Sequence, residues 1–417
     1  MKKILTVFCS AVLLSGILVF ADDENYDGQL LTGDFSRKSM VNSSWRNATT
    51  GAERVKFIYS DLTNAIFDGA VMNAWFGAVT FNGASFRGAD LSKRTTDGTG
   101  FDAAKVINVD FTGANLSDVN FQNADVSGSN FTDAIINGAN FGENIAVKNF
   151  TLEQLCSTKS YKIKDLSRVN FCKVSLDGGD FSDQNLQHAR FYKGSLKNTN
   201  FTGADLRDTF AADVDYEGKR IKNTIWQTGE IKNFSMESAD DNLTIRKYTP
   251  VASSGKMINA KVSESDATVS GGATLKLDTG ARLDVVNKKT LTIAENGVLV
   301  IDTAASDPTQ IYIESLAGLV IDGKLTVNIT EDLLPNVEYR FDLISFESDS
   351  NIASLKDLKP DESLYLTIKG KTFNGYWSCV INENKFTILA TQVPEPAIVA
   401  AIFGALALGL AVFRRRK

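Results

Sequence analysis

A five-residue period of large apolar residues dominates the N-terminal half of the chain and constrains its fold. The period is clearest between Leu166 and Met236, where nearly every fifth residue is large and apolar. Its members are Leu166, Phe171, Leu176, Phe181, Leu186, Phe191, Leu196, Phe201, Leu206, Tyr216, Ile221, Trp226, Ile231 and Met236. Neither the 3.6-residue period of a helix nor the two-residue period of a strand would keep these side chains on one face. The pattern therefore predicts a coil that turns by a constant angle every five residues, with four sides.

The same phase extends upstream, and a small residue commonly stands two places before each large one. The upstream members are Phe76, Phe81, Phe86, Leu91, Phe101, Val106, Phe111, Leu116, Phe121, Val126, Phe131, Ile136 and Phe141. We expect both residues to point inward, because the large one fills the lumen and the small one leaves it room. The other three positions carry polar residues and Gly, which suit solvent and tight corners.

The complete repeat is Phe-Thr-Gly-Ala-Asn at residues 111–115 and Phe-Thr-Gly-Ala-Asp at residues 201–205. It resembles the pentapeptide-repeat family, whose members fold as right-handed quadrilateral β-helices. This resemblance implies an all-β fold over residues 28–240, with coils stacked about 4.8 Å apart. Residues 151–165 interrupt the repeat with apolar side chains at helical spacing. We expect this insertion to be a short amphipathic helix looped out of the wall, either for specific contact or as a packed bulge.

The N-terminus predicts export. Lys2 and Lys3 precede an apolar run at residues 4–20, and Ala21 stands just before three acidic residues. This arrangement is typical of a secretory signal peptide over residues 1–21, with cleavage after Ala21. We therefore expect the mature protein to leave the cytoplasm.

The C-terminus has three parts that follow one another directly. They are the motif Val393, Pro394, Glu395 and Pro396, the apolar residues 397–413, and the basic residues Arg414, Arg415, Arg416 and Lys417. The apolar run can just span a bilayer, and the basic end would then stay cytoplasmic. The three parts resemble the PEP-CTERM sorting signal of Gram-negative bacteria, which an exosortase of the inner membrane processes. The resemblance implies a transient single-pass anchor over residues 393–417; an ordinary permanent anchor is the alternative.

A second β-rich region is expected over residues 251–391. Apolar pairs recur there about every eight residues, with glycines near the turns. The pairs are Leu275 and Leu277, Leu283 and Val285, Leu291 and Ile293, Leu299 and Ile301, Ile311 and Ile313, and Leu319 and Ile321. Short alternating strands with regular turns predict a stacked or rolled β-structure. The part from residue 325 to residue 389 resembles the strand-rich end of autotransporter-type passenger domains.

Residues suited to catalysis or metal binding are few. His188 is the only histidine and stands at an outward position of the repeat, which excludes a histidine-based triad or a multi-histidine metal site. Asp177, Asp180 and Asp183 could share one exposed patch, but they lack the spacing and glycine of an EF-hand loop. A solvated acidic face is the better interpretation. We therefore expect no catalytic, cofactor-binding or metal-binding residues and no enzyme activity.

The composition suits an extracellular structural protein. A chain of 417 residues with a net charge of −6 is neither a nucleic-acid binder by bulk electrostatics nor a disordered polyanion. The mature cysteines are Cys156, Cys172 and Cys379, an odd number that does not indicate a disulfide framework. Cys156 and Cys172 could pair if the insertion folds back on the wall, and free thiols are the alternative.

Together these observations predict an exported, non-enzymatic protein of the cell envelope or extracellular matrix, acting as a rigid scaffold or adhesion rod. Its expected partners are an exosortase-like processing enzyme, the inner membrane before processing, and extracellular polysaccharide or surface proteins. Some pentapeptide-repeat proteins resemble duplex DNA and occupy topoisomerases, but the signal peptide and the interleaved lysines argue against a nucleic-acid role here. The alternatives are a secreted carbohydrate-active enzyme and a carbohydrate-binding protein.

Overall fold

The computed structural model describes residues 25–393, apart from residues 52, 93–97, 143–144, 251–256, 353, 356–357, 359–362 and 383. The predicted signal peptide with Ala21, the motif residues after Val393, the apolar run 397–413 and the basic end all lie outside the described residues. The chain divides into two compact units, Met1–Thr228 and Gly229–Lys417. They are called unit 1 and unit 2 below, and each is described by itself.

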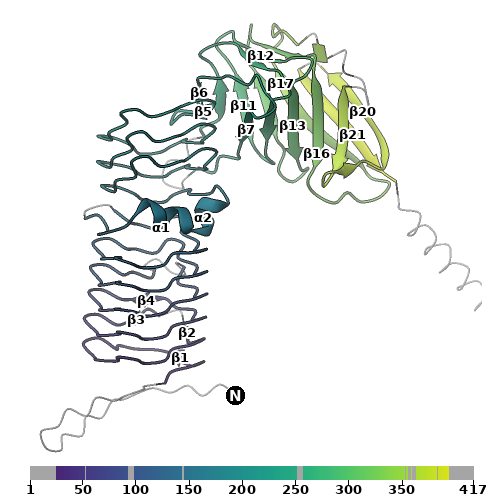
Figure 1. Ribbon diagram of the computed structural model, residues 1–417. Coiled ribbons are helices and arrows are strands. Elements are labelled where there is room, and N and C mark those ends of the chain that lie inside the picture. The colour runs from purple at the N-terminus through teal and green to yellow at the C-terminus, as the bar shows by residue number, and fades with distance from the viewer. Residues whose placement is uncertain are drawn as a thin grey trace, which may run out of the picture. The chain divides into compact units, whose positions relative to one another are not determined.

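Unit 1 is a stack of four-sided coils (Figure 1). Parallel bridges join residues one coil apart, and between Gly100 and Asn140 that interval is twenty residues, as in Lys105 to Asp125 and Asn120 to Asn140. Twenty residues per coil with a large inward residue every five give four sides, so the predicted quadrilateral β-helix is confirmed. The strands long enough to be named are β1 Leu30–Leu31, β2 Thr49–Thr50, β3 Val55–Lys56, β4 Ala74–Trp75 and β5 Thr224–Ile225.

The corners of the coil explain the polar positions of the repeat. The residue two places after each large one turns the chain with a positive φ, for example 69° at Gly113, 58° at Asn123 and 57° at Asp133. Gly adopts this left-handed conformation without steric cost, and Asn and Asp tolerate it better than most residues. The third position of the repeat is therefore selected by backbone geometry.

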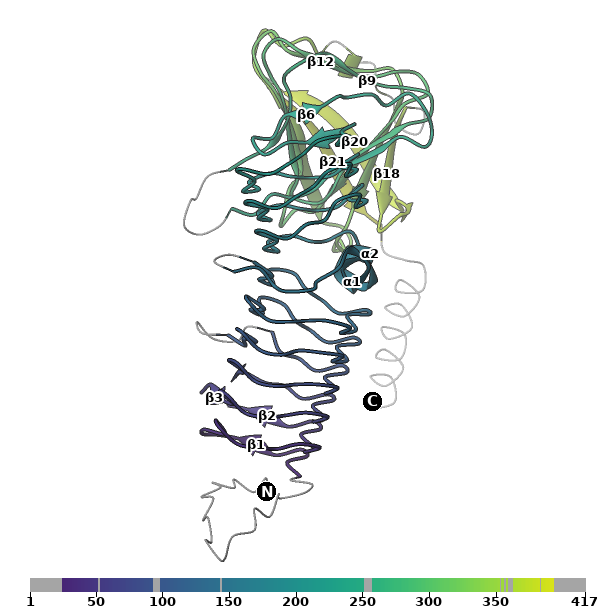
Figure 2. The same cartoon turned by 60° about the vertical axis from the view of Figure 1, so that its left-hand side comes forward.

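Figure 2 shows the stacked coils of unit 1 from a second side, and phenylalanine rings fill their lumen in columns that run along the stack. One column runs from Phe35 to Phe191, with neighbouring ring centroids 5.0 to 5.9 Å apart and ring planes within 26° of parallel. Its members are Phe35, Phe57, Phe76, Phe101, Phe121, Phe141, Phe171 and Phe191. Offset stacking of this kind adds to the free energy gained by burying each ring.

Unit 2 is also built from stacked parallel strands, arranged in three sheets. Two sheets have six strands, in the orders β19-β18-β16-β13-β10-β7 and β20-β21-β17-β14-β11-β8, and the third has the order β15-β12-β9. Consecutive strands such as β10, β11 and β12 belong to different sheets, so the turns that begin at β7, β10 and β13 each pass through all three. The strand bounds are β6 Ile231–Lys232, β7 Asn242–Ile245, β8 Ala260–Val262, β9 Ala267–Val269, β10 Thr274–Leu277, β11 Arg282–Val285, β12 Thr290–Ile293, β13 Val298–Thr303, β14 Gln310–Ile313, β15 Gly318–Ile321, β16 Lys324–Ile329, β17 Glu338–Phe346, β18 Leu364–Ile368, β19 Lys371–Thr372, β20 Gly375–Asn382 and β21 Lys385–Gln392.

The apolar pairs of the sequence stack on one another inside unit 2. Leu275 and Leu277 on β10 lie opposite Leu299 and Ile301 on β13, and all four side chains are buried. The last strands reverse direction: β21 pairs antiparallel with both β17 and β20, and β19 pairs antiparallel with β18. The parallel stack therefore ends in antiparallel pairs.

Candidate functional site

Residues 151–165 contain the only α-helices in the described part of the chain. These are α1, Leu152–Ser157, and α2, Lys159–Lys162. Thr151 caps α1: its hydroxyl accepts from the Gln154 N–H at 3.1 Å, and its own N–H donates to Gln154 Oε1 at 2.9 Å. This reciprocal pair, a capping box, satisfies two backbone donors that a helix start otherwise leaves unpaired.

The prediction that this segment loops out of the wall is wrong, because it forms one side of a coil. The Asp133 N–H donates to the Ser157 carbonyl at 3.0 Å, and the Lys159 N–H donates to the Ala134 carbonyl at 2.9 Å. On the other side, the Tyr161 hydroxyl donates to the Asp180 carbonyl. Leu155 is fully buried in the same core as the phenylalanine columns. The helices thus bond to the coils on either side and fill the lumen.

A second aromatic column is interrupted at the level of α1. It runs from Tyr26 to Phe131 and resumes where Phe181 stacks on Phe201 at 5.7 Å. Between Phe131 and Phe181, Leu155 of α1 is fully buried. The rings that contact the two broken ends are Phe150 and Tyr161, and each meets its neighbour edge-on instead of stacking. On the outside, the helical side also leaves a gap in the surface next to the preceding coil.

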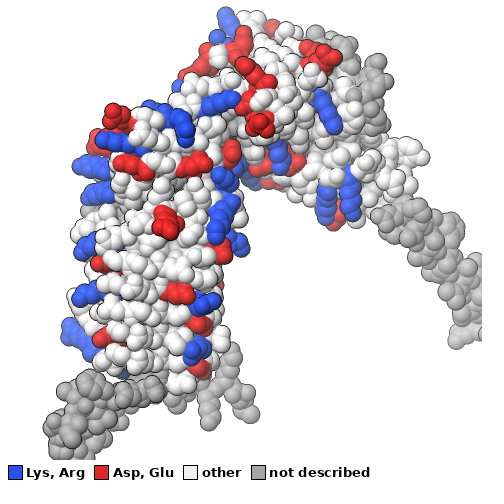
Figure 3. Space-filling model, viewed as in Figure 1, with Lys and Arg blue, Asp and Glu red and all other residues white. Residues whose placement is uncertain are grey.

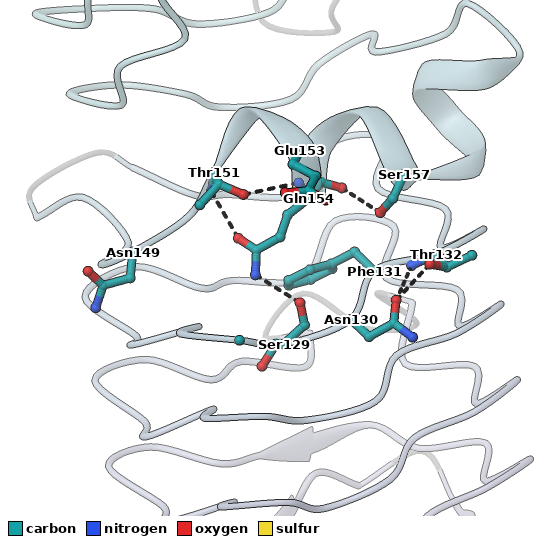
Figure 4. A pocket seen from close by; sticks show the side chains of 10 residues that line it. Ser129, Asn130, Phe131, Thr132, Asn149, Thr151, Glu153, Gln154 and Ser157 are labelled. Atoms are coloured by element: carbon teal, nitrogen blue, oxygen red, sulfur yellow. Dashed lines mark hydrogen bonds between the residues drawn. The ribbon is translucent and has the colours of Figure 1, made fainter.

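That gap is a hollow of about 410 Å³ between α1 and the coil that carries residues 128–132 (Figure 4). It is lined by Gly128, Ser129, Asn130, Phe131, Thr132, Asn149, Thr151, Glu153, Gln154 and Ser157. Seven of these ten residues have polar, uncharged side chains. Glu153, which is exposed, is the single ionisable side chain of the lining.

The lining is held in place by hydrogen bonds to the coil. Gln154 Nε2 donates to the carbonyls of Ser129 at 2.8 Å and Val126 at 3.1 Å, as Figure 4 shows for Ser129. Asn130 Oδ1 accepts from both the N–H and the hydroxyl of Thr132. An array of fixed amides and hydroxyls suits a neutral polar ligand. One carboxylate does not supply the acid and base pair that glycoside hydrolysis uses.

The ionisable residues considered from the sequence have other partners. His188 Nδ1 lies 2.9 Å from Asp208 Oδ2 at a corner of the coil. Asp177 accepts from the Ser195 hydroxyl, and Asp180 accepts from the Asn200 amide. Among the residues that the structure describes, no group of His, Cys, Asp and Glu could hold a metal ion.

One ion pair in unit 1 is completely buried. Arg207 donates to both carboxylate oxygens of Asp205, from Nε at 2.9 Å and from Nη2 at 2.6 Å, and Gln187 donates to the second oxygen at 2.8 Å. Burial alone would raise the pKa of Asp205, but the adjacent guanidinium outweighs it and lowers that pKa below its ordinary value. The pair belongs to the structure rather than to an exposed site.

Other predicted features are placed as follows. Cys156, Cys172 and Cys379 are all free thiols, and Cys172 is buried. Val393 ends the described part of the chain, and its N–H donates to the Asn374 carbonyl at 3.1 Å. No helix within the described ranges is long and apolar enough to cross a membrane.

Comparison with known proteins supports the repeat assignment. The family model for pentapeptide repeats matches eight copies, at residues 101–143 and 165–203. The gap between the two matched ranges includes the helical side. No curated protein matches the chain.

Solved structures of pentapeptide-repeat proteins are similar to part of the chain. One is HetL, a pentapeptide repeat protein involved in heterocyst differentiation regulation from the cyanobacterium Nostoc, with 14% identity over 50% of this chain and 91% of HetL and a TM-score of 0.31. Another is a trypsin-treated form of QnrB1, a plasmid-mediated fluoroquinolone resistance protein, with 19% identity over 46% of this chain and 92% of that chain and a TM-score of 0.24.

Proposed function

We propose that the protein is an exported, non-enzymatic scaffold of the cell envelope or extracellular matrix, in which unit 1 is a stiff spacer. The supporting observation is the unbroken aromatic column from Phe35 to Phe191, seven ring contacts long. Each ring packs between the coils above and below in a closed lumen. Bending the stack would open gaps on one side, and gaps in a close-packed core are costly.

The stiffness can be measured directly. Arg37 and Lys193 occupy equivalent corners beside the two ends of the column. Seven coil spacings of about 4.8 Å should hold these positions about 34 Å apart. We expect spin labels at Arg37→Cys and Lys193→Cys, with Cys156 and Cys379 changed to Ser, to give one narrow distance distribution. A broad distribution would rule out a stiff spacer.

The proposal of export rests on the two ends of the sequence. Residues 1–21 have the pattern of a secretory signal, and residues 393–417 resemble a PEP-CTERM signal. On this proposal an exosortase-like enzyme of the inner membrane removes the anchor, and the protein then reaches the cell surface or the polysaccharide matrix. Mass spectrometry of protein recovered from the host surface tests this step. A mature C-terminus that still ends in residues 414–417 would mean a permanent anchor.

A double variant of the motif, compared with a control variant elsewhere, makes the sorting test more specific. Changing Pro394 and Pro396 to Ala removes residues that resist helix formation and hold the segment extended. We expect the unprocessed protein to accumulate in the inner membrane. Pro335→Ala is the matched control, because Pro335 lies in a loop of unit 2, and it should be processed normally.

The charge pattern of unit 1 does not favour a nucleic-acid mimic. On the face in Figure 3, basic and acidic side chains are interspersed. One corner even alternates in sign along the stack, through Asp27, Arg46, Asp68 and Arg87: the Arg46 N–H donates to Asp27, and the Arg87 N–H donates to Asp68. A DNA-like surface would need one continuous sign of charge.

A carbohydrate-binding role is the second candidate, and the hollow beside α1 supports it. Its amides and hydroxyls could pair with sugar hydroxyls, whereas its single carboxylate favours binding over cleavage. Binding of the protein to a panel of extracellular polysaccharides, compared with a Gln154→Ala variant, tests this candidate. Equal binding by both proteins would show that the hollow is not the carbohydrate-binding site.

A further inference from the structure

The two six-stranded sheets of unit 2 end in very different edge strands. The first ends at β19, which has only two residues, both exposed and one of them Lys371. The second ends at β20, which has eight residues and contains neither a charged residue nor a proline. Short length and lysine are devices that keep a sheet edge from pairing with another chain. The β19 edge has both devices, and the β20 edge has neither.

The pairing register shows which backbone groups β20 leaves open. Asn374, just before β20, accepts a hydrogen bond from the residue opposite it, Val393. Bonded pairs alternate along an antiparallel ladder, so the even-numbered residues of β20 bond to β21. The odd-numbered residues then direct their N–H and C=O groups to the outer edge. These residues are Gly375, Trp377, Cys379 and Ile381.

The outer edge of β20 is also accessible. Within the described part of the chain, no strand pairs with this side of β20, which stands last in its sheet. Tyr376 is 79% exposed, and Ser378 is exposed on the same face. Trp377 and Cys379, on the opposite face, are half-buried. The edge thus offers a row of open backbone groups flanked by apolar side chains.

We propose that β20 is a docking edge for a second copy of this chain, which adds its own β20 in antiparallel orientation. A strand without charges meets no like charge when it pairs with an identical strand. The antiparallel direction continues the pattern of β17, β21 and β20. A two-fold axis also closes the assembly, because both open edges are used at once.

One register satisfies every open group of the edge. If Ser378 lies opposite the partner subunit's Ser378, then Gly375 faces the partner's Ile381 and Trp377 faces the partner's Cys379. All four outward residues of each copy are then bonded. The two Ser378 residues form a non-bonded pair, whose Cα atoms lie about 4.5 Å apart. That separation is within the range that a disulfide can bridge.

Disulfide trapping in the full chain tests both the edge and the register. In a Cys379→Ser background, we expect Ser378→Cys to form a covalent dimer under mild oxidation, resolved on a non-reducing gel. Tyr376→Cys is the matched control, because the two copies of residue 376 would lie about 13 Å apart in this register. We expect at least about tenfold less dimer from it, although Tyr376 is highly exposed.

Both substitutions lie on the exposed face of β20 and should leave the fold intact. Circular dichroism of each variant checks this, so that the dimer yield reports on the edge alone. Dimer from Ser378→Cys alone supports the proposal. Equal yields from the two variants would indicate random collision, and no dimer from either would indicate a different occupant of the edge or none. Both results would overturn the proposal. The Cys379→Ser variant alone retains Cys156 and Cys172 and should give no dimer. This control shows that neither of these cysteines forms the crosslink.

Discussion

Unit 1 and unit 2 are both stacks of parallel strands, but they fill their interiors differently. Each five-residue side of unit 1 sends one large side chain inward, and phenylalanine rings form columns. Each longer side of unit 2 sends two or three side chains inward, and the core consists mainly of Leu, Ile and Val. The length of a side therefore determines the chemistry of the core.

The physical reason lies in how much space one residue must fill. A single inward residue per side has to reach the middle of the lumen, which suits a large flat ring that stacks on the next coil. Two alternating residues share that space, and β-branched side chains then pack well on a pleated surface. The two units thus show two solutions to the same stacking problem.

The largest expected effect concerns the helical side of unit 1. Replacing residues 151–165 with a short Gly/Ser link would remove Leu155 from the core and the bonds to both neighbouring coils. We expect unit 1 to lose on the order of 5 kcal/mol or more of stability, from one core side chain and several hydrogen bonds. Denaturant unfolding followed by circular dichroism measures this, with the transition of unit 2 as internal control. An unchanged unfolding transition of unit 1 would show that the segment lies outside the core and does not stabilise the coils.

The second test compares the two cores. Phe121 is fully buried and stacks on Phe101 at 5.0 Å and on Phe141 at 5.3 Å. We expect Phe121→Ala to cost roughly 3 to 5 kcal/mol in unit 1 and Leu299→Ala roughly 2 to 5 kcal/mol in unit 2. Each substitution should move only its own unfolding transition.

A conservative variant separates stacking from burial. Phe121→Leu keeps an apolar side chain but removes the ring, so it should still cost about 1 kcal/mol through lost stacking. The exposed Lys193→Ala should leave the unfolding midpoint unchanged. If Phe121→Leu matched the wild type, the aromatic columns would contribute nothing beyond apolar area.

The cap of α1 gives a smaller effect. Thr151→Ala removes the hydroxyl that accepts from the Gln154 N–H, which should destabilise unit 1 by about 1 kcal/mol. Thr151→Ser retains the hydroxyl and should restore most of that stability. Equal midpoints for the Ala and Ser variants would show that the capping hydrogen bond is not needed to hold the helical side.

The last test uses the dependence of the stability of unit 2 on pH. Burial alone would raise the pKa of Asp342 in unit 2, but hydrogen bonds from Lys385, Thr387 and Arg340 outweigh it and hold that pKa at about 2. A lowered pKa stabilises the fold above the ordinary value of 3.8, and this stabilisation disappears as pH falls through about 2. We expect the melting temperature of unit 2 to fall over this range, and Asp342→Asn to flatten the fall. An equal fall in melting temperature for the wild type and Asp342→Asn would show that other groups cause the acid sensitivity of unit 2.

The repeat made the regular part of unit 1 predictable. Every fifth residue from Phe101 to Phe141 is buried as the period indicates, because one spacing determines which side chains enter the lumen. The corner residues were also predictable in type, since a left-handed turn selects Gly, Asn and Asp.

The helical side was not predictable in the same way. Apolar spacing in residues 151–165 indicated a helix, but it gave no information on what the helix would pack against. That depends on pairings with distant residues, such as Gln154 with the carbonyls of Val126 and Ser129. The Thr151 and Gln154 pair is the one local signal of this site, because a capping box can be read from residue types alone. The hollow follows from the replaced side and has no signature of its own.

The helical side also affects how the coils of a periodic chain find their pairing register. Over residues 100–140, where every bridge joins residues twenty places apart, a slip of one coil during folding would keep every large side chain inside. Such a sequence alone leaves many shifted alignments almost equal in energy. One coil with α1 and α2 cannot be exchanged with its neighbours, because only there do Leu155 and the capped helix fit. The helices therefore fix the register of unit 1, because the coils on either side can pair with this coil in only one alignment.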